Sequence, residues 1–417
     1  MMKKNIYPLF ITTLLLMHHP VPAQQRVTLD TLVSQVLRAN PGYRAMQEQV
    51  NSAQSRVKQA TAWSDPQLSV EFMGTPISSA NLFRDAMERK FSVQQMIPFP
   101  GKKFSAAQGA QASVGMAQNI SASYQRDLVQ RVKKEFVMLY AAQERIRVNE
   151  ESQALVRQMI SSVETRYSVA QASQADVLKL QLELEKLRNE RASLEHDLKV
   201  PVAMINSMRS LRPEADIGLL EDVTLLPFTQ NLDALTDRAI GNRPELKAMQ
   251  FEREMNSAEL AMWNRERLPD FMIGAAYVNV AEMTDTYELM LGINLPLAPW
   301  SSGKYTGKIE ESEIAIRRTD HQIAEMKNMI RFEVYDAWIK AKAHWEIADR
   351  LQRSMIPQAE QTLHALLIAY QTHKADFLSL LDSYRMLNMY RMEFYMELAD
   401  HSMHVADLER ATGGSLQ

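Results

Sequence analysis

The spacing of hydrophobic and polar positions changes in a regular order along the chain. Leu68, Val70 and Phe72 alternate with polar neighbours, and a period of two indicates a strand with two different faces. A polar loop leads to a second such segment, so we expect a β-hairpin over about 67–97. The same alternation returns later, and we expect a second β-hairpin over about 271–295.

Helical sequence fills most of the remaining length. No residue from 102 to 167 breaks a helix apart from two tolerable glycines, and at 1.5 Å per residue such a helix reaches about 100 Å. The segment 303–370 repeats this pattern, except that Pro357 should kink or locally unwind the helix. We expect each long helix to turn back at a tip, over about 168–176 in the first half and 371–376 in the second.

Each returning helix places its apolar positions at alternating steps of three and four residues, which is the spacing of a coiled coil. The arginine in this seam occurs in both halves. The seam of the first half is Val177, Leu180, Leu184, Leu187, Arg191, Leu194 and Leu198, and that of the second is Phe377, Leu380, Tyr384, Leu387, Arg391, Phe394 and Leu398.

The two halves are copies of one unit. Residues 29–47 (LDTLVSQVLRANPGYRAMQ) and 232–250 (LDALTDRAIGNRPELKAMQ) are identical at seven of 19 positions without a gap. We therefore expect a first repeat over 24–220 and a second over 221–417, the latter ending in a C-terminal tail. Each contains a helix, a β-hairpin and a long helical hairpin. The expected fold class is mainly α with a small β part.

The first 23 residues have the composition of a cleaved signal peptide. Lys3 and Lys4 give a positive start, residues 6–17 an apolar core, and Ala23 ends a small-residue cleavage signal. The apolar run is shorter than the roughly 20 residues of a membrane-spanning helix, so we expect export. The sequence contains no cysteine. Disulfides, thiol catalysis and a lipid anchor on the mature N-terminus are therefore not expected.

The strands are the expected membrane device, because no later segment is apolar enough for a transmembrane helix. Open strand edges are not tolerated in lipid, and the smallest outer-membrane barrels have eight strands. Four strands per chain would therefore need neighbours from other subunits. The alternative is that both hairpins are soluble ribbons that cap helical bundles. In a barrel, a wet lumen would be lined by Glu71, Ser92, Gln94, Glu288 and Asn294.

On these features the chain resembles the TolC-like outer-membrane efflux proteins (outer membrane factors). The resemblance rests on the doubled Leu-x-x-Leu…Asn-Pro segment at 29–41, the Pro-Phe-Pro-Gly-Lys exit at 98–102, and twin turn motifs at 167–178 and 370–378. It implies a homotrimer with a 12-stranded barrel in the outer membrane and an α-barrel tunnel across the periplasm. A belt would come from about 200–230 and the C-terminal tail.

The resemblance also implies partners and a gate. The partners are a periplasmic adaptor and an inner-membrane pump of RND or ABC type. The heavy-metal branch (copper/silver or cobalt-zinc-cadmium) and the multidrug branch share this plan. In the family, a tyrosine at the second tip bonds an aspartate at the first, and the matching residues are Tyr370 and Asp176. Asp382 matches an acidic position of the constriction, and Lys374 lies at the same tip.

The tips also have a plain structural reading, and they depart from the family pattern. Asp176 and Asp376 each begin a helix after a turn, where a carboxylate caps free backbone N–H groups. The family's turn glycine is Ala170 in one tip and His373 in the other. An acidic position of the second repeat is Ser379, so an acidic ring would be thinner.

Composition adds few candidate sites. The 26 methionines lie mostly at core-like helical spacing, where Met is a filler. His401 and His404 are one helical turn apart without an evident carboxylate partner, and we interpret them as solvated surface. We expect no metal site, no cofactor and, in the absence of any catalytic motif, no enzyme activity. A mildly acidic chain without a basic block also argues against nucleic acid.

The leading hypothesis is therefore a passive exit duct of a tripartite efflux complex. A type I protein secretion channel would use the same architecture with another cargo. A periplasmic coiled-coil adaptor that never enters the membrane is the alternative from a different class.

Overall fold

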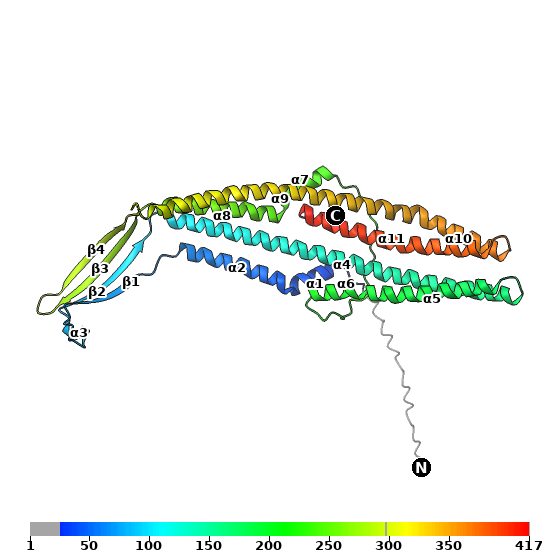
Figure 1. The fold of residues 1–417 in the computed structure, drawn as a ribbon, viewed down its shortest axis with the longest axis horizontal. Coiled ribbons are helices and arrows are strands. Elements are labelled where there is room, and N and C mark those ends of the chain that lie inside the picture. Colours follow the sequence, from blue (N-terminus) through cyan, green and yellow to red (C-terminus); the bar gives the residue numbers. More distant parts are fainter. Residues whose placement is uncertain (1–25, 297, 417) are drawn as a thin grey trace, which may run out of the picture.

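The computed structural model describes residues 26–296 and 298–416. The predicted signal peptide lies outside these residues. The molecule is long and narrow, with a β-sheet at one end and the two tips, where each long helix turns back, at the other (Figure 1). Among the described residues, no helix combines the length and apolar character needed to cross a membrane.

The two repeats contain the same succession of major elements. The first comprises α1 (Leu29–Ala39), α2 (Pro41–Thr61), β1 (Gln67–Met73), α3 (Leu82–Asp85), β2 (Glu88–Ile97), α4 (Lys102–Ser168), α5 (Gln174–Asp197) and α6 (Lys199–Met208). The second comprises α7 (Leu232–Asn242), α8 (Pro244–Glu266), β3 (Asp270–Val280), β4 (Thr286–Asn294), α9 (Ser302–Arg350), η1 (Leu351–Met355), α10 (Ile356–Gln371) and α11 (Phe377–Thr412). The predicted fold class, mainly α with a small β part, is confirmed.

Prolines set two kinds of break in the helices. Pro41 and Pro244 open α2 and α8, and the residue before each proline is extended, because a following proline disfavours the helical conformation. Pro357 lies just after η1, a π-helical segment inside the long second-repeat helix. A proline removes one helical hydrogen bond and pushes away the carbonyl four residues back. Local unwinding at Pro357 was predicted, and the wider π turn provides it.

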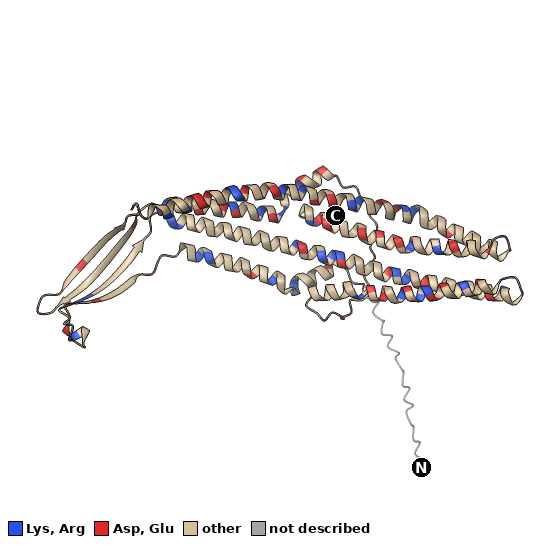
Figure 2. Ribbon diagram, in the orientation of Figure 1, with Lys and Arg blue, Asp and Glu red and all other residues tan. Residues whose placement is uncertain are grey.

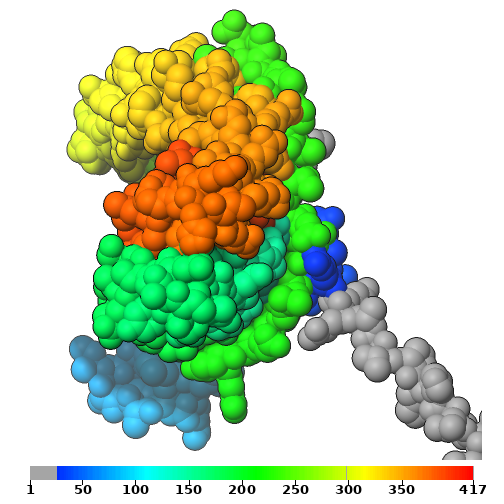
Figure 3. All heavy atoms as spheres, turned by 90° about the vertical axis from the view of Figure 1, so that its right-hand side faces the viewer, coloured from blue at the N-terminus to red at the C-terminus, as the bar shows by residue number. Residues whose placement is uncertain are grey.

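The apolar seams of both repeats meet in one core close to the tips. Val177, Leu180 and Leu184 of α5 share this core with Phe377 and Leu380 of α11, so the heptad spacing does mark a buried stripe. Seen from the tips, the helical hairpins of the two repeats are stacked on each other (Figure 3). The core runs along this contact and holds the hairpins together.

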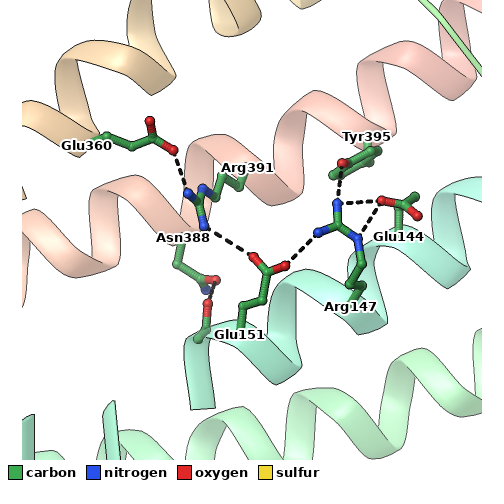
Figure 4. Close-up of polar contacts among 8 residues, drawn as sticks. Glu144, Arg147, Glu151, Glu360, Asn388, Arg391 and Tyr395 are labelled. Atoms are coloured by element: carbon green, nitrogen blue, oxygen red, sulfur yellow. Dashed lines mark hydrogen bonds and ion pairs between the residues drawn. The ribbon is translucent and has the colours of Figure 1, made fainter. Parts of the chain in front are cut away.

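The repeated seam arginines leave the core and pair with two adjacent acids of α4. Arg191 lies 2.9 Å from Glu150. Arg391 contacts Glu151 at 3.5 Å and Glu360 of α10 at 2.5 Å, so it connects three helices (Figure 4). In the same network, Arg147 of α4 contacts Glu151 at 2.6 Å and donates to the Tyr395 hydroxyl of α11 at 2.8 Å. Arg191 and Arg391 therefore add ion pairs between helices at the edge of the seam.

Candidate functional site

The sheet at one end of the molecule is the first candidate. Its strand order is β1-β2-β3-β4, and every pair is antiparallel. Strands β2 and β3 join the two hairpins, with Phe91 opposite Tyr277 and Val93 opposite Ala275. Because residues in register share a face, Val70, Phe91, Tyr277 and Tyr287 form one row across the four strands.

One face of this sheet is apolar and open. Leu289 and Leu291 of β4 are 88% and 86% exposed, and Leu68 of β1 is 83% exposed. Charged residues are also sparser on the sheet than on the helices (Figure 2). An apolar patch of this kind marks contact with lipid or with another protein. The chain alone does not provide that contact.

The opposite face of the sheet is polar. Ser69 and Ser92 are hydrogen-bonded at 2.6 Å, and Lys90 of β2 reaches across β3 to Glu288 of β4 at 2.6 Å. Register places Glu71, Ser92 and Glu288 on this same face. Among the described residues, β1 and β4 have a strand neighbour on one side only. The sheet thus has two free edges and two faces of opposite character.

The tips at the other end are built on matching helix terminations. In the first, the Gln171 N–H donates to Arg166 O and the Ala170 N–H to Tyr167 O; in the second, Lys374 and His373 make the equivalent bonds to Ala369 and Tyr370. This is the Schellman motif, whose left-handed position is usually glycine. Ala170 and His373 occupy it with φ of 61° and 58°. Ala170 and His373 therefore adopt the backbone conformation of the family's turn glycine. Both residues are strained in it, because they carry a Cβ atom that glycine lacks.

Arg166 ties the two tips to each other. Its guanidinium lies over the Tyr370 ring, 4.4 Å from the centroid, and donates to Tyr370 O and to His373 Nδ1, the latter at 2.6 Å. Tyr370 is buried and packs edge-on against Phe377. Burial raises the pKa of Tyr370; Asp176 raises it further and Arg166 lowers it. Tyr370, which was predicted as one half of the latch, is therefore held in place by Arg166. The sequence alone did not indicate this arginine.

Asp176 lies close enough to act on Tyr370 electrostatically, but its own hydrogen bonds are local. Ser173 caps α5, and Asp176, three residues on, accepts from the Ser173 N–H at 3.2 Å in a capping box. Asp376 is itself the N-cap of α11 and accepts from the Ser379 N–H at 2.9 Å. These bonds hold the pKa of Asp376 below its usual value. The two aspartates thus cap their helices from different positions.

The remaining predicted gate residues lie on the exposed side of the second tip. Lys374 is exposed, and its backbone N–H closes the Schellman motif. Asp382 is exposed and lies 3.9 Å from Arg385. Arg385 pairs mainly with Glu183 of α5. The Glu183 side chain is buried and accepts two hydrogen bonds from the Arg385 guanidinium, at 2.6 and 3.0 Å. This ion pair between α5 and α11 raises the pKa of Arg385 through its hydrogen bond, and it was not predicted.

Comparison with known proteins agrees with this geometry. Residues 32–206 match the family model described as outer membrane efflux protein, and the second repeat is the internal copy of that region. Over 94% of this chain and 92% of its own length, the cobalt-zinc-cadmium resistance protein CzcC of Cupriavidus metallidurans is 22% identical. The first repeat is therefore similar in sequence to the outer-membrane efflux family.

Solved structures of such channels have the same fold along nearly the whole chain. CusC, described for its folding and transmembrane channel formation, has a TM-score of 0.77 and 15% identity, covering 93% of this chain and 92% of its own. The outer membrane protein VceC of Vibrio cholerae has a TM-score of 0.74 and 15% identity, covering 93% and 97%. Because the outer-membrane efflux family consists of channels, the prediction that the chain is not an enzyme is confirmed.

The structure corrects the interpretation of His401 and His404 as solvated surface. His401 is only 6% exposed, and its Nδ1 lies 2.8 Å from Ala341 O, so it is not solvated surface. Burial lowers its pKa, with further lowering from His344 and His404. His404 does have a carboxylate partner, Asp407 at 3.3 Å. Asp407 lies three residues after His404, on the same helix face, so the expected lack of a carboxylate partner was wrong.

Proposed function

We propose that three copies of the chain form a passive exit duct through the outer membrane. The observation that carries this proposal is the sheet: four strands, one apolar face, one polar face and two free edges at the end of a long helical body. Lipid would cover the apolar face, water would fill the space along the polar face, and each free edge would pair with that of a neighbouring copy. Three copies would contribute twelve strands to one closed barrel.

In this proposal the helices continue the duct through the periplasm and the tips meet its partners. The helical hairpins of three copies would line a tunnel, with about 200–230 and the C-terminal tail as a belt around its middle. Trp338 and Trp345 of α9 donate to Gln230 O and Leu226 O, each at 2.9 Å, and fix this segment to the tunnel wall. A periplasmic adaptor and an inner-membrane pump would deliver cargo at the tips, because a passive duct takes its energy from a partner.

We propose that the gate lies at the tips, with Tyr370 and Asp176 as its latch and with Asp382 and Lys374 at the constriction. The support is that Asp176 acts on the Tyr370 phenol while Arg166 holds Tyr370 in place. Opening would move the second tip away from the first, as a dilation of packed helices.

The cargo we propose is a divalent metal ion. The support is the likeness to a protein named for cobalt, zinc and cadmium resistance over almost the full length of both chains. A strain without this protein should become more sensitive to these metals. Sensitivity to hydrophobic antibiotics alone would favour a multidrug channel, and loss of a secreted protein would favour type I secretion.

The channel itself is tested by planar-bilayer recording of the purified full chain. The wild type should give small closed-state conductances, and Tyr370→Phe and Asp176→Asn should raise them. Recovery of the protein as a soluble periplasmic monomer with no conductance would support the adaptor alternative and end the channel proposal.

A further inference from the structure

Two long helices bring histidines and carboxylates together at the middle of the helical body. His344 lies on α9, and Glu397, Asp400 and His404 lie on α11, which packs alongside it (Figure 1). His344 Nδ1 is 2.7 Å from Glu397 Oε2 and 3.9 Å from Asp400 Oδ2. One ligand atom from each of these three residues lies within 4.8 Å of the other two.

The spacing of the α11 residues allows their side chains to bind one ion together. Positions 397, 400 and 404 follow steps of three and four residues, so their side chains leave the same face of the helix. The His404 ring stacks on the His344 ring with centroids 5.3 Å apart. All four side chains are partly buried, which protects the cluster but leaves it open to an ion.

The outer contacts of the cluster are ordered as they are around known metal ligands. His404 Nδ1 faces Asp407, and Asp407 in turn accepts from Gln130 at 2.6 Å and lies 2.5 Å from Lys134, both on α4. Carboxylates in this position fix the ring orientation of a metal-binding histidine and leave Nε2 free. The cluster therefore extends over three helices.

We propose that His344, Glu397 and Asp400 bind a divalent first-row transition ion, with His404 as the neighbouring fourth donor. Imidazole and carboxylate together suit Zn²⁺, Co²⁺ and Ni²⁺, whereas Mg²⁺ and Ca²⁺ prefer oxygen donors alone. Metal–ligand bonds of about 2.0–2.2 Å place two ligands of one ion up to about 4.2 Å apart. Separations within 4.8 Å would close on an ion by small side-chain rotations.

A bound ion would tie α9 to α11 at the level of the proposed belt. The His344–Glu397 hydrogen bond would be replaced by two bonds to the metal. This site does not depend on the cargo of the channel, because an ion held between two helices of one chain can be structural. Binding also stabilises the folded state in proportion to the ligand concentration over Kd.

The test is a titration of the full chain, purified in detergent without a histidine tag and stripped with a chelator. Co²⁺ should give visible d–d absorption that saturates at one ion per chain, and Zn²⁺ should displace it. Melting temperature should rise with Zn²⁺ and stay unchanged with Mg²⁺. His344→Gln should weaken Co²⁺ binding by at least about tenfold and abolish the Zn²⁺-dependent rise.

The matched control is His364→Gln, because His364 is exposed on the next helix, α10. This variant should titrate like the wild type. Asp400→Asn provides a second test at a more exposed ligand, should His344→Gln melt early without metal. Binding of equal strength in the wild type, His344→Gln and Asp400→Asn would overturn the site. The absence of saturable Co²⁺ binding in the wild type would reduce the cluster to a His–Glu ion pair.

Discussion

The two tips have related sequences and similar backbones, but their tyrosines have opposite environments. Tyr167 is 48% exposed, whereas its copy Tyr370 is 7% exposed and belongs to the core. Arg166 precedes Tyr167 in the chain but packs against Tyr370. The long helix also differs: α4 is continuous, while its copy is interrupted by η1. The two repeats thus share a backbone frame, and their side chains make the second tip the more firmly held one.

This difference indicates where a closing contact can form. The second tip rests on the first through Arg166 and Tyr370, so displacement of one breaks contacts of the other. Tyr167 is exposed, and the described residues show no comparable contact between it and the second tip. A gate built on these tips should therefore respond strongly to changes around Tyr370 and weakly to the same changes at Tyr167.

The largest expected effect comes from truncating the two tyrosines. Tyr370→Ala should destabilise the protein by about 3–5 kcal/mol, as for other buried aromatic residues, while Tyr167→Ala should cost less than about 0.5 kcal/mol. Thermal melting of the purified variants measures both. Equal losses would show that the tips are equivalent.

At the sheet end, unlike at the tips, equivalent substitutions in the two repeats should have similar effects. Both repeats expose the same apolar face there. Leu291 of the second repeat and Val93 of the first are both exposed and apolar, and Arg at either position should cost about 2–4 kcal/mol if it faces the bilayer midplane. Both variants should lower the yield of assembled protein in outer membranes. Met290→Arg, on the polar face, is the control and should assemble; normal assembly of Leu291→Arg would place that residue away from lipid.

Removal of the arginine that joins the tips should have an intermediate effect. Arg166→Ala removes two hydrogen bonds and a cation–π contact, together worth about 2 kcal/mol, and should raise single-channel conductance. Arg157→Ala, which lies on the same helix and contacts Gln153 instead, is the control. Conductance unchanged in Arg166→Ala would separate the tip contact from gating.

The smallest effect concerns the strained turn positions. Ala170→Gly should stabilise the fold by about 1 kcal/mol, because glycine adopts the left-handed conformation freely. His373→Gly should gain less, since it also loses the contact between Arg166 and His373. Melting temperatures compare them directly. A larger gain at His373 would mean that this contact contributes nothing.

The sequence predicted features with a local period and missed contacts between distant positions. Alternation predicted strands near Val70 and Leu291, and heptad spacing predicted the buried seam, because both patterns follow from backbone geometry. The partners of Tyr370, Glu183 and His344 lie 204, 202 and 53 residues away, and no periodic signal links such positions. Arg166 is a basic residue in the last turn of α4, where basic side chains are common in any helix, so its position in the sequence does not indicate a partner at the other tip.

The proposed barrel depends most on the pairing of β1 with β4 of another copy. The absence of cysteine allows a clean cross-linking test: Ser69→Cys on β1 combined in turn with Glu288→Cys, Met290→Cys or Gly292→Cys on the same face of β4. We predict that a short bismaleimide, applied to outer membranes, gives covalent dimers and trimers and nothing larger, for at least one pair. Monomers alone for all three pairs, with both cysteines shown to be reactive, would contradict the shared barrel.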